Sequence, residues 1–167
     1  MTSSRVAYRI TQFWHALLEQ PNPIDKDLAR QVLTPKQMAL FERMPAYEQA
    51  HSLRVFKQIY TCPEKSELLP NEDLFVAALL HDVGKICHPL RLWERIVIVL
   101  ARAFFPARCV GWGQVAGADG HGVSRLSWRR PFVVAVKHPE WGASLAAETG
   151  VSPFAVDLIR RHQNQIP

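Results

Sequence analysis

Cysteine is scarce in this 167-residue chain, which contains only Cys62, Cys87 and Cys109. The number is odd, and no two of the three stand in a Cys-x-x-Cys spacing. Small domains that depend on disulfides or on cysteine-bound zinc carry paired cysteines. Both kinds of framework are therefore disfavoured, and the composition favours a reducing, cytoplasmic compartment.

A long hydrophobic run is also missing. The most apolar stretch, residues 96–101, lies between Arg95 and Arg102. A helix that spans a bilayer needs about 20 apolar residues. The first residues of the chain show no apolar core of a secretory signal peptide either. We therefore expect a protein without a transmembrane segment, located in the cytoplasm.

Negative charge is in modest deficit, because 20 lysines and arginines face 15 acidic residues, a formal net charge of +5. Such an excess is compatible with anionic partners such as phosphorylated small molecules, nucleic acid or a membrane surface. It is equally compatible with plain solubility. Charge alone thus predicts no specific nucleic-acid partner, and nothing in the sequence determines the oligomeric state.

The alternating pattern of a β-strand is absent, whereas apolar residues recur at helical spacing along most of the chain. With 48% hydrophobic residues, the length suits a single domain with a substantial core. The sequence predicts one compact all-α domain over residues 1–167, with an insert or lid at about 88–132. The predicted helices cover residues 5–20, 25–43 (with a break before Thr34 and Pro35), 45–60, 71–84, 92–105, 138–150 and 152–162.

Two stretches of the insert have a distinct composition. Residues 92–105 are apolar on nearly every face, which predicts deep burial rather than contact with a partner or a membrane. Residues 111–122 are rich in glycine and are expected to form a loop. A basic and aromatic group follows, for which an exposed loop anchored by Trp128 is favoured over a role in guiding an anionic substrate. The group comprises Arg125, Trp128, Arg129 and Arg130.

Histidine stands where apolar residues are expected. His81 follows Leu74, Ala77 and Ala78 at helical spacing, and His51 and His162 lie on similar stripes of other predicted helices. Imidazole on apolar faces is uncommon unless it has hydrogen-bond partners or binds a metal. These histidines are therefore candidate metal ligands.

The pair His81-Asp82 combines the two ligand types that a divalent transition metal accepts, imidazole and carboxylate. Adjacent residues of a helix diverge by about 100°, so the two side chains converge on one ion only where a helix ends. Gly84 predicts such an end directly after the pair. His51 then completes a three-ligand face.

These motifs resemble the HD superfamily of metal-dependent phosphohydrolases. The resemblance rests on His51 in Glu-Gln-Ala-His-Ser-Leu-Arg-Val and on the doublet in Leu-Leu-His-Asp-Val-Gly-Lys. It continues in the segment Lys-His-Pro-Glu-Trp-Gly-Ala around His138 and in Ile-Arg-Arg-His at His162, both similar to the two-metal branch. The similarity covers residues 45–165 but omits 88–132, and the Gly-Tyr-Pro segment of cyclic dinucleotide phosphodiesterases is absent.

The resemblance implies hydrolysis of a phosphomonoester or phosphodiester, including nucleotides, by metal-activated water. It implies that His51, His81 and Asp82 bind one ion, and that His138 and His162 bind a second ion or the phosphate. Asp82 is expected to hold the metal and to orient or deprotonate the water. The ligand set suits manganese, iron, cobalt, nickel or zinc without choosing among them.

Two cationic side chains are candidates for binding the phosphate of a small substrate. Lys85 follows the doublet and is also favoured there as a cation near a helix end. Arg54 lies about one turn beyond His51. We therefore predict catalytic roles for Asp82 and Lys85 and substrate-binding roles for Lys85 and Arg54.

The superfamily supplies a final aspartate ligand after the last histidine, and this sequence has none there. Asp157 lies off the helical face of His162, and Asp119 belongs to the glycine-rich stretch. The alternative to an enzyme is therefore a catalytically inactive HD module that senses a ligand or binds a protein. A peripheral membrane or nucleic-acid binder, based on the basic excess and residues 92–105, ranks third.

Overall fold

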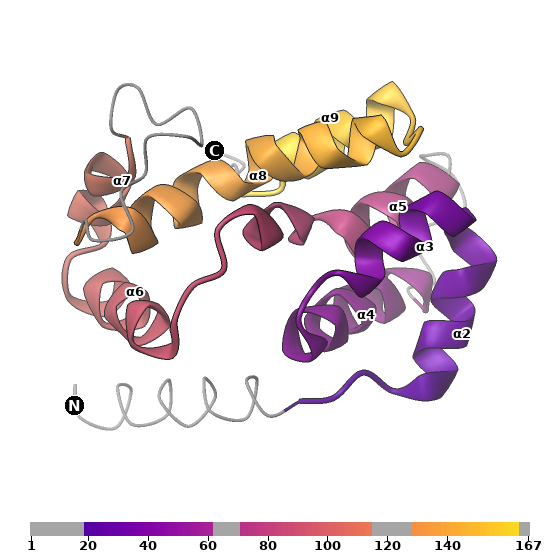
Figure 1. Cartoon of the computed structure of the whole chain (residues 1–167), viewed down its shortest axis with the longest axis horizontal. Coiled ribbons are helices and arrows are strands. Elements are labelled where there is room, and N and C mark those ends of the chain that lie inside the picture. The colour runs from indigo at the N-terminus through magenta and orange to yellow at the C-terminus, as the bar shows by residue number, and fades with distance from the viewer. Residues whose placement is uncertain (1–18, 62–70, 115–127, 164–167) are drawn as a thin grey trace.

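Every regular element in the described part of the chain is a helix (Figure 1). The computed structural model describes residues 19–61, 71–114 and 128–163. The all-α prediction is confirmed over these ranges, whereas residues 5–18 of the first predicted helix and residues 115–127 of the insert lie outside them. The elements are α2 (Pro23–Val32), α3 (Pro35–Glu42), α4 (Ala46–Tyr60), α5 (Asn71–Leu80), the 3₁₀ helix η2 (Val83–Cys87), α6 (Leu92–Phe104), α7 (Pro106–Gly113), α8 (Arg130–Glu148) and α9 (Pro153–Arg161).

Three short helices begin at a proline preceded by a capping side chain. The side chain of Asn22 accepts a hydrogen bond from a backbone N–H of α2, and Ser152 does the same for α9. Thr34 and Gln37 form a reciprocal capping box at the start of α3. Proline tolerates the first helical turn because its missing N–H has no partner there in any case. The predicted break before Pro35 and the predicted restart at Pro153 are confirmed.

The main core lies around α5, whose last five residues are all buried. On its two sides α5 contacts α4 and α9. The largest fully buried apolar side chains are Phe41, Phe56, Leu53, Leu79, Leu80 and Ile159. Figure 1 shows α2 to α5 gathered at one end and α6 and α7 at the other, with α8 extending between them. This arrangement places the end of α5, η2 and the middle of α8 near the centre of the molecule.

Helix α8 begins well before the position expected from the sequence. Pro139 was predicted to start a helix, but α8 starts at Arg130 and continues through Pro139. The prediction was wrong because proline usually marks a first helical turn, and only packing offsets the lost hydrogen bond in a helix interior. His138 and Pro139 are both buried. The longer helix carries His138 into the core instead of leaving it at a helix start.

Gly84 brings η2 into direct contact with the backbone of α8. A Cβ atom built on Gly84 would lie 1.9 Å from the carbonyl oxygen of His138 and 2.5 Å from the nitrogen of Gly142. A Cβ atom built on Gly142 would in turn lie 3.0 Å from the nitrogen of Gly84. The absence of side chains at these two positions therefore fixes how closely the loop after α5 approaches α8.

Helix α6 is less buried than its composition predicted. Trp93 is 51% exposed and Phe104 is 59% exposed, whereas Ala101 and Glu94 face inward. A helix that is apolar on every face is usually buried, but periodicity alone does not reveal how many neighbours cover it. Within the described residues, no helix is both long enough and apolar enough to cross a membrane.

A buried ion pair joins α6 to the start of α8. Arg130 donates to both carboxylate oxygens of Glu94, one at 2.6 Å, and also to the carbonyl oxygen of Pro89. Glu94 is 1% exposed and Arg130 is 7% exposed. The favoured prediction of an exposed basic loop is therefore wrong for Arg130, and the predicted anchor Trp128 is 57% exposed.

The start of the glycine-rich stretch is helical rather than a loop. Helix α7 includes Gly111 and ends at Gly113. Gly113 is buried against α8, where an added Cβ atom would meet the carbonyl oxygen of Phe132 at 2.5 Å. The glycine here permits close helix packing, so a composition that is typical of loops predicted the wrong local structure.

Candidate metal centre

Five side chains predicted as ligands come together from separate elements of the fold. His51 lies in α4, and His81 and Asp82 occupy the two positions between α5 and η2. His138 lies in the middle of α8, and His162 caps the C-terminus of α9. Helix α5 ends at Leu80, four residues before Gly84, so the doublet stands just beyond the helix and its side chains are free to converge.

Asp82 is the centre of the group. The Nε2 atoms of His51 and His81 lie 3.7 Å and 3.3 Å from its Oδ2 atom. The Nε2 atoms of His138 and His162 lie 3.2 Å and 3.8 Å from its Oδ1 atom. Asp82 is 4% exposed. Each oxygen of one buried carboxylate thus faces two imidazole nitrogens.

Backbone carbonyl groups orient three of the four rings. The Nδ1 atoms of His81, His138 and His162 lie 2.9, 3.0 and 2.8 Å from the carbonyl oxygens of residues 78, 134 and 159. A carbonyl oxygen only accepts, so each Nδ1 atom carries the hydrogen. The Nε2 atom of each ring, when neutral, then presents a lone pair to Asp82. This arrangement is typical of metal-binding histidines.

The charges of the group are strongly coupled. Burial acts to raise the pKa of Asp82, but hydrogen bonds that His138 and His81 donate from Nε2 in their charged form, together with the charge of Lys85, hold this pKa well below its usual range. Burial lowers the pKa of His162 to about 4, so its ring is neutral near pH 7. Burial also lowers the pKa of His51, more than Asp82 raises it. For His81 burial acts in the same direction, but Asp82 outweighs it and raises the pKa.

A bound cation would remove an electrostatic repulsion between His162 and Asp82. Neutral His162 carries its hydrogen on Nδ1, so the lone pair of its Nε2 atom faces the negative Asp82 carboxylate. Two such acceptors repel each other unless a positive ion lies between them. Ligand atoms that bind one ion at about 2.1 Å, at angles of 90° to 109°, lie about 3.0–3.4 Å apart. The distances to Asp82 differ little from these values, so small side-chain rotations suffice.

The donors form two groups of three ligands that share Asp82. One group is His51, His81 and Asp82, and the other is Asp82, His138 and His162; in each the ligand atoms lie within 4.8 Å of one another. These residues can hold a metal ion in either group. Sites with three protein ligands leave a coordination position for water or substrate.

Arg54 contacts Nδ1 of His51, the ring nitrogen that does not face Asp82. Its guanidinium group lies 3.2 Å from His51 Nδ1 and also pairs with Glu19. Because arginine only donates, His51 Nδ1 accepts, and a neutral His51 carries its hydrogen on Nε2. Binding of a metal at Nε2 requires the opposite tautomer. Arg54, predicted to bind substrate, therefore opposes metal binding at His51 in this arrangement.

Replacement of Arg54 by alanine is expected to raise the affinity of the His51 group for a divalent metal about threefold to tenfold. The change removes a competing donor and a nearby positive charge. The expected change in metal affinity is small for an outer-shell contact because Arg54 is exposed. Titration with Co²⁺ against a chelator measures it, with Arg30→Ala as an exposed-arginine control. Weaker metal binding by the Arg54→Ala protein would contradict this assignment.

Lys85 links the metal group to a second buried carboxylate. Its Nζ atom lies 2.7 Å from Asp82 Oδ2 and 3.0 Å from Glu48 Oε2. Burial acts to lower the pKa of Lys85, but Asp82 and Glu48 outweigh it and raise the pKa. Arg95 lies 3.5 Å from Glu48 Oε1 and stacks over the ring of Tyr47. Two cations and two carboxylates thus balance, and a bound metal would make the site positive.

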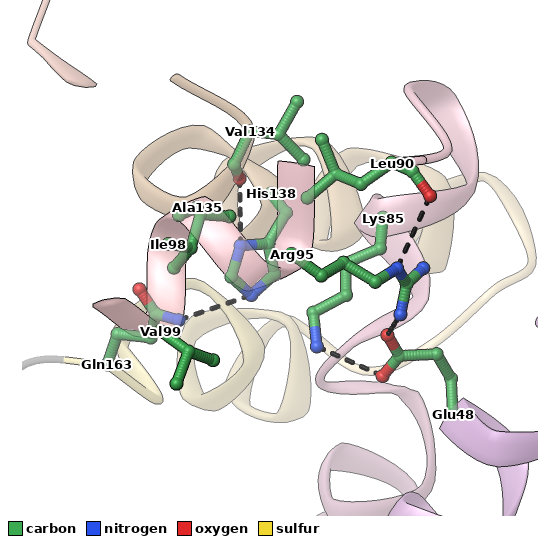
Figure 2. A pocket seen from close by; sticks show the side chains of 10 residues that line it. All are labelled: Glu48, Lys85, Leu90, Arg95, Ile98, Val99, Val134, Ala135, His138 and Gln163. Carbon is green, nitrogen blue, oxygen red and sulfur yellow. Dashed lines mark hydrogen bonds and ion pairs between the residues drawn. The ribbon is translucent and has the colours of Figure 1, made fainter. Parts of the chain in front are cut away.

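A cavity of about 180 Å³ opens beside this charge network (Figure 2). His138 belongs to both the cavity wall and the metal group, and Lys85 connects the two through its ion pair with Asp82. Figure 2 shows Glu48 contacting Lys85 and Arg95 on one side, while Gln163 donates to His138 Nε2 at 3.3 Å on the other. The wall consists of Glu48, Lys85, Leu90, Arg95, Ile98, Val99, Val134, Ala135, His138 and Gln163. Arg54 is not part of it.

Sequence reasoning missed three polar residues of this cavity. Glu48 and Arg95 pair across 47 positions of the chain, and such a contact leaves no local pattern. Gln163, next to His162, had no charge or motif to single it out. Asp157, rejected as a ligand from its spacing, pairs with Arg161, and Asp119 lies outside the described residues.

The histidines without a motif lie apart from this centre or outside the described residues. The His88 ring packs at a tilt against Trp141, with 4.7 Å between the ring centroids, whereas His15 and His121 are in segments that the structure does not describe. The candidate centre therefore consists of the four histidines and the aspartate that the sequence indicated. In comparisons with protein-family models, curated proteins and solved structures, the chain has no match.

Proposed function

We propose that this protein is a metal-dependent phosphohydrolase of the HD type, which binds two divalent transition-metal ions on either side of Asp82. The observation that carries the proposal is the placement of four Nε2 atoms around one buried carboxylate, two facing each oxygen. A bridging carboxylate with imidazole ligands is a common way to hold two ions close together. The mixed nitrogen and oxygen donors suit manganese, iron, cobalt, nickel or zinc.

The ions would supply a strong Lewis acid that activates water and polarises the phosphoryl oxygens. The chain itself positions and balances the reacting groups. Carbonyl oxygens fix three histidine rings, so the ligand atoms are oriented before an ion arrives. Each group offers three protein ligands, which is the usual number in a catalytic site that keeps one position for water or substrate. A further aspartate ligand is therefore not required.

Lys85 is the residue best placed to bind the phosphate. It is held by Glu48 as well as by Asp82, so it stays in place when Asp82 binds metal. Its remaining N–H can then donate to a phosphate oxygen, and its positive charge can stabilise the negative charge of that oxygen. This interaction strengthens as negative charge develops during the reaction. Arg95 adds positive charge across Glu48 at the same cavity wall.

The activity test uses 4-nitrophenyl phosphate and bis(4-nitrophenyl) phosphate with protein depleted of metal and then reloaded with Mn²⁺, Co²⁺, Ni²⁺ or Zn²⁺. We expect hydrolysis of at least one ester only in the reloaded protein, because water activation needs the ion. A protein that binds two ions and hydrolyses neither ester would instead be the inactive HD module, a sensor or binding domain.

Replacing Lys85 by methionine is expected to lower kcat/KM by about 10²-fold while metal content stays the same. Loss of one group that stabilises developing charge typically has an effect of about 10² to 10³. The matched control is Lys137→Met, since Lys137 is half-buried like Lys85 but lies outside the cavity wall and pairs with Glu140 at 3.5 Å. An unchanged kcat/KM in Lys85→Met would remove Lys85 from the mechanism.

A further inference from the structure

The cavity beside the metal group has two chemically distinct sides. Lys85, Arg95, Glu48 and His138 form its polar side, next to the centre. The other side is mostly apolar and comes from two helices, with Ile98 and Val99 in α6 and Val134 and Ala135 in α8. Gln163 lies beside Val99 at its edge, and Leu90 lies next to Arg95. A molecule with a phosphate at one end and an uncharged group at the other matches this division.

The size of the cavity limits the uncharged group. An apolar protein cavity of about 150 Å³ accepts a single benzene ring. The present cavity of about 180 Å³ is partly open to solvent, and its walls therefore surround about one ring or a compact branched chain. A charged polyphosphate would have to bury oxygens against Ile98 and Val99, which is unfavourable because these side chains offer no hydrogen bonds.

The electrostatic balance of the polar side supports the same division. Lys85 and Arg95 share Glu48, and Lys85 also pairs with Asp82, so the four charges cancel before a metal binds. The extra positive charge then arises only at the metal group, beside His138. A phosphate is attracted to that end, and the rest of the substrate is left against the side formed by α6 and α8.

We propose that this cavity binds the organic group of a phosphate ester and selects a compact apolar group of about one ring. The inference rests on the proposed phosphohydrolase function and adds the substrate class. The selecting residues Ile98 and Val99 lie in the segment outside the HD-like motifs, so the selectivity is a property of this chain's own insert. Phosphorylated aromatic or branched aliphatic alcohols are the substrates of this class.

The test measures binding of two non-hydrolysable probes, phenylphosphonate and methylphosphonate, to the Mn²⁺-loaded protein by calorimetry. The two share the phosphonate group and differ in the organic group. We expect phenylphosphonate to bind at least about tenfold more tightly, since a single methylene in an apolar pocket already changes selectivity about tenfold or more. Equal affinities, or no binding of phenylphosphonate, would overturn the inference.

A filled cavity provides the matched variant. Ala135→Leu places a larger side chain in the cavity wall, whereas Ala147→Leu makes the same change at an exposed position of the same helix. We expect Ala135→Leu to lose the preference for the phenyl probe while it keeps wild-type affinity for methylphosphonate. Ala147→Leu should bind both probes as the wild type does. An unchanged preference in Ala135→Leu would also overturn the inference.

These experiments can contradict the phosphohydrolase proposal and the cavity assignment independently of each other. If the wild type prefers phenylphosphonate but hydrolyses no ester, the cavity assignment stands and the phosphohydrolase proposal falls. If the wild type hydrolyses phenyl phosphate and methyl phosphate with equal kcat/KM and binds both probes equally, the phosphohydrolase proposal stands and the cavity assignment falls.

Discussion

Replacing Asp82 by asparagine is expected to lower the affinity for divalent metal by more than about 10²-fold at both positions and to abolish metal-dependent hydrolysis. Asp82 is the one residue shared by the two ligand groups. Asparagine keeps the size of the side chain but removes its negative charge and turns one oxygen into an NH₂ donor. Loss of outer-shell contacts alone costs about 10-fold to 100-fold in metal affinity, and Asp82 is a direct ligand in the proposal.

The measurement is metal content by elemental analysis, with affinities from chelator competition. Asp157→Asn is the matched control, because Asp157 pairs with Arg161 at the surface of α9. The control protein should bind metal as the wild type does. Retention of one ion at wild-type affinity in Asp82→Asn would show that the two groups do not depend on a common carboxylate.

Replacing Gly84 by alanine is expected to reduce the free energy of unfolding by about 3 kcal/mol or more. Overpacking a core usually costs about 1–3 kcal/mol, because side chains shift to make room. Here the new Cβ atom meets backbone atoms of α8, at 1.9 Å and 2.5 Å, and these atoms cannot rotate away. At about 2–4 °C per kcal/mol for a chain of this size, the midpoint of thermal unfolding should fall by about 6–12 °C.

Gly111→Ala is the control for Gly84→Ala. Gly111 lies in α7, and no atom is found within 4 Å of a Cβ added there. Alanine is favoured over glycine in a helix by roughly 0.5–1 kcal/mol, so this variant should be as stable as the wild type or slightly more stable. Urea denaturation of the metal-free proteins compares the two. If the variants differed by less than about 1 kcal/mol, the contact between η2 and α8 would be looser than described.

Gly84→Ala should also weaken metal binding. The residue follows Asp82 by two positions, so a displaced η2 moves both members of the His81-Asp82 pair away from His138. A destabilised protein that nevertheless binds two ions at wild-type affinity would separate the packing role of Gly84 from the geometry of the centre.

Local signals in the sequence predicted most of the helices and the five side chains that meet in the candidate centre. Thr34-Pro35 and Ser152-Pro153 marked helix starts because capping side chains and proline act within one turn. His51 and His81 stood out because they replace apolar residues at helical spacing. The elements that carry them pack around one core, and this packing brings the side chains together.

Features that depend on packing between distant segments were not predictable in the same way. Pro139 suggested a helix start, but contacts of α8 with η2 and α9 sustain a helix through it. The Glu94–Arg130 pair and the Glu48–Arg95 pair join residues 36 and 47 positions apart. No periodic pattern records such contacts, so neither the cavity nor the role of Arg54 beside His51 followed from the sequence.

The most direct test of a shared two-metal centre is anomalous X-ray diffraction from crystals of the Mn²⁺-loaded protein. We expect two manganese peaks, one among His51, His81 and Asp82 and the other among Asp82, His138 and His162. Two ions held by a common carboxylate should lie about 3.5–4 Å apart. Absence of any manganese peak beside the Asp82 carboxylate, in crystals that contain manganese elsewhere, would contradict the shared two-metal centre.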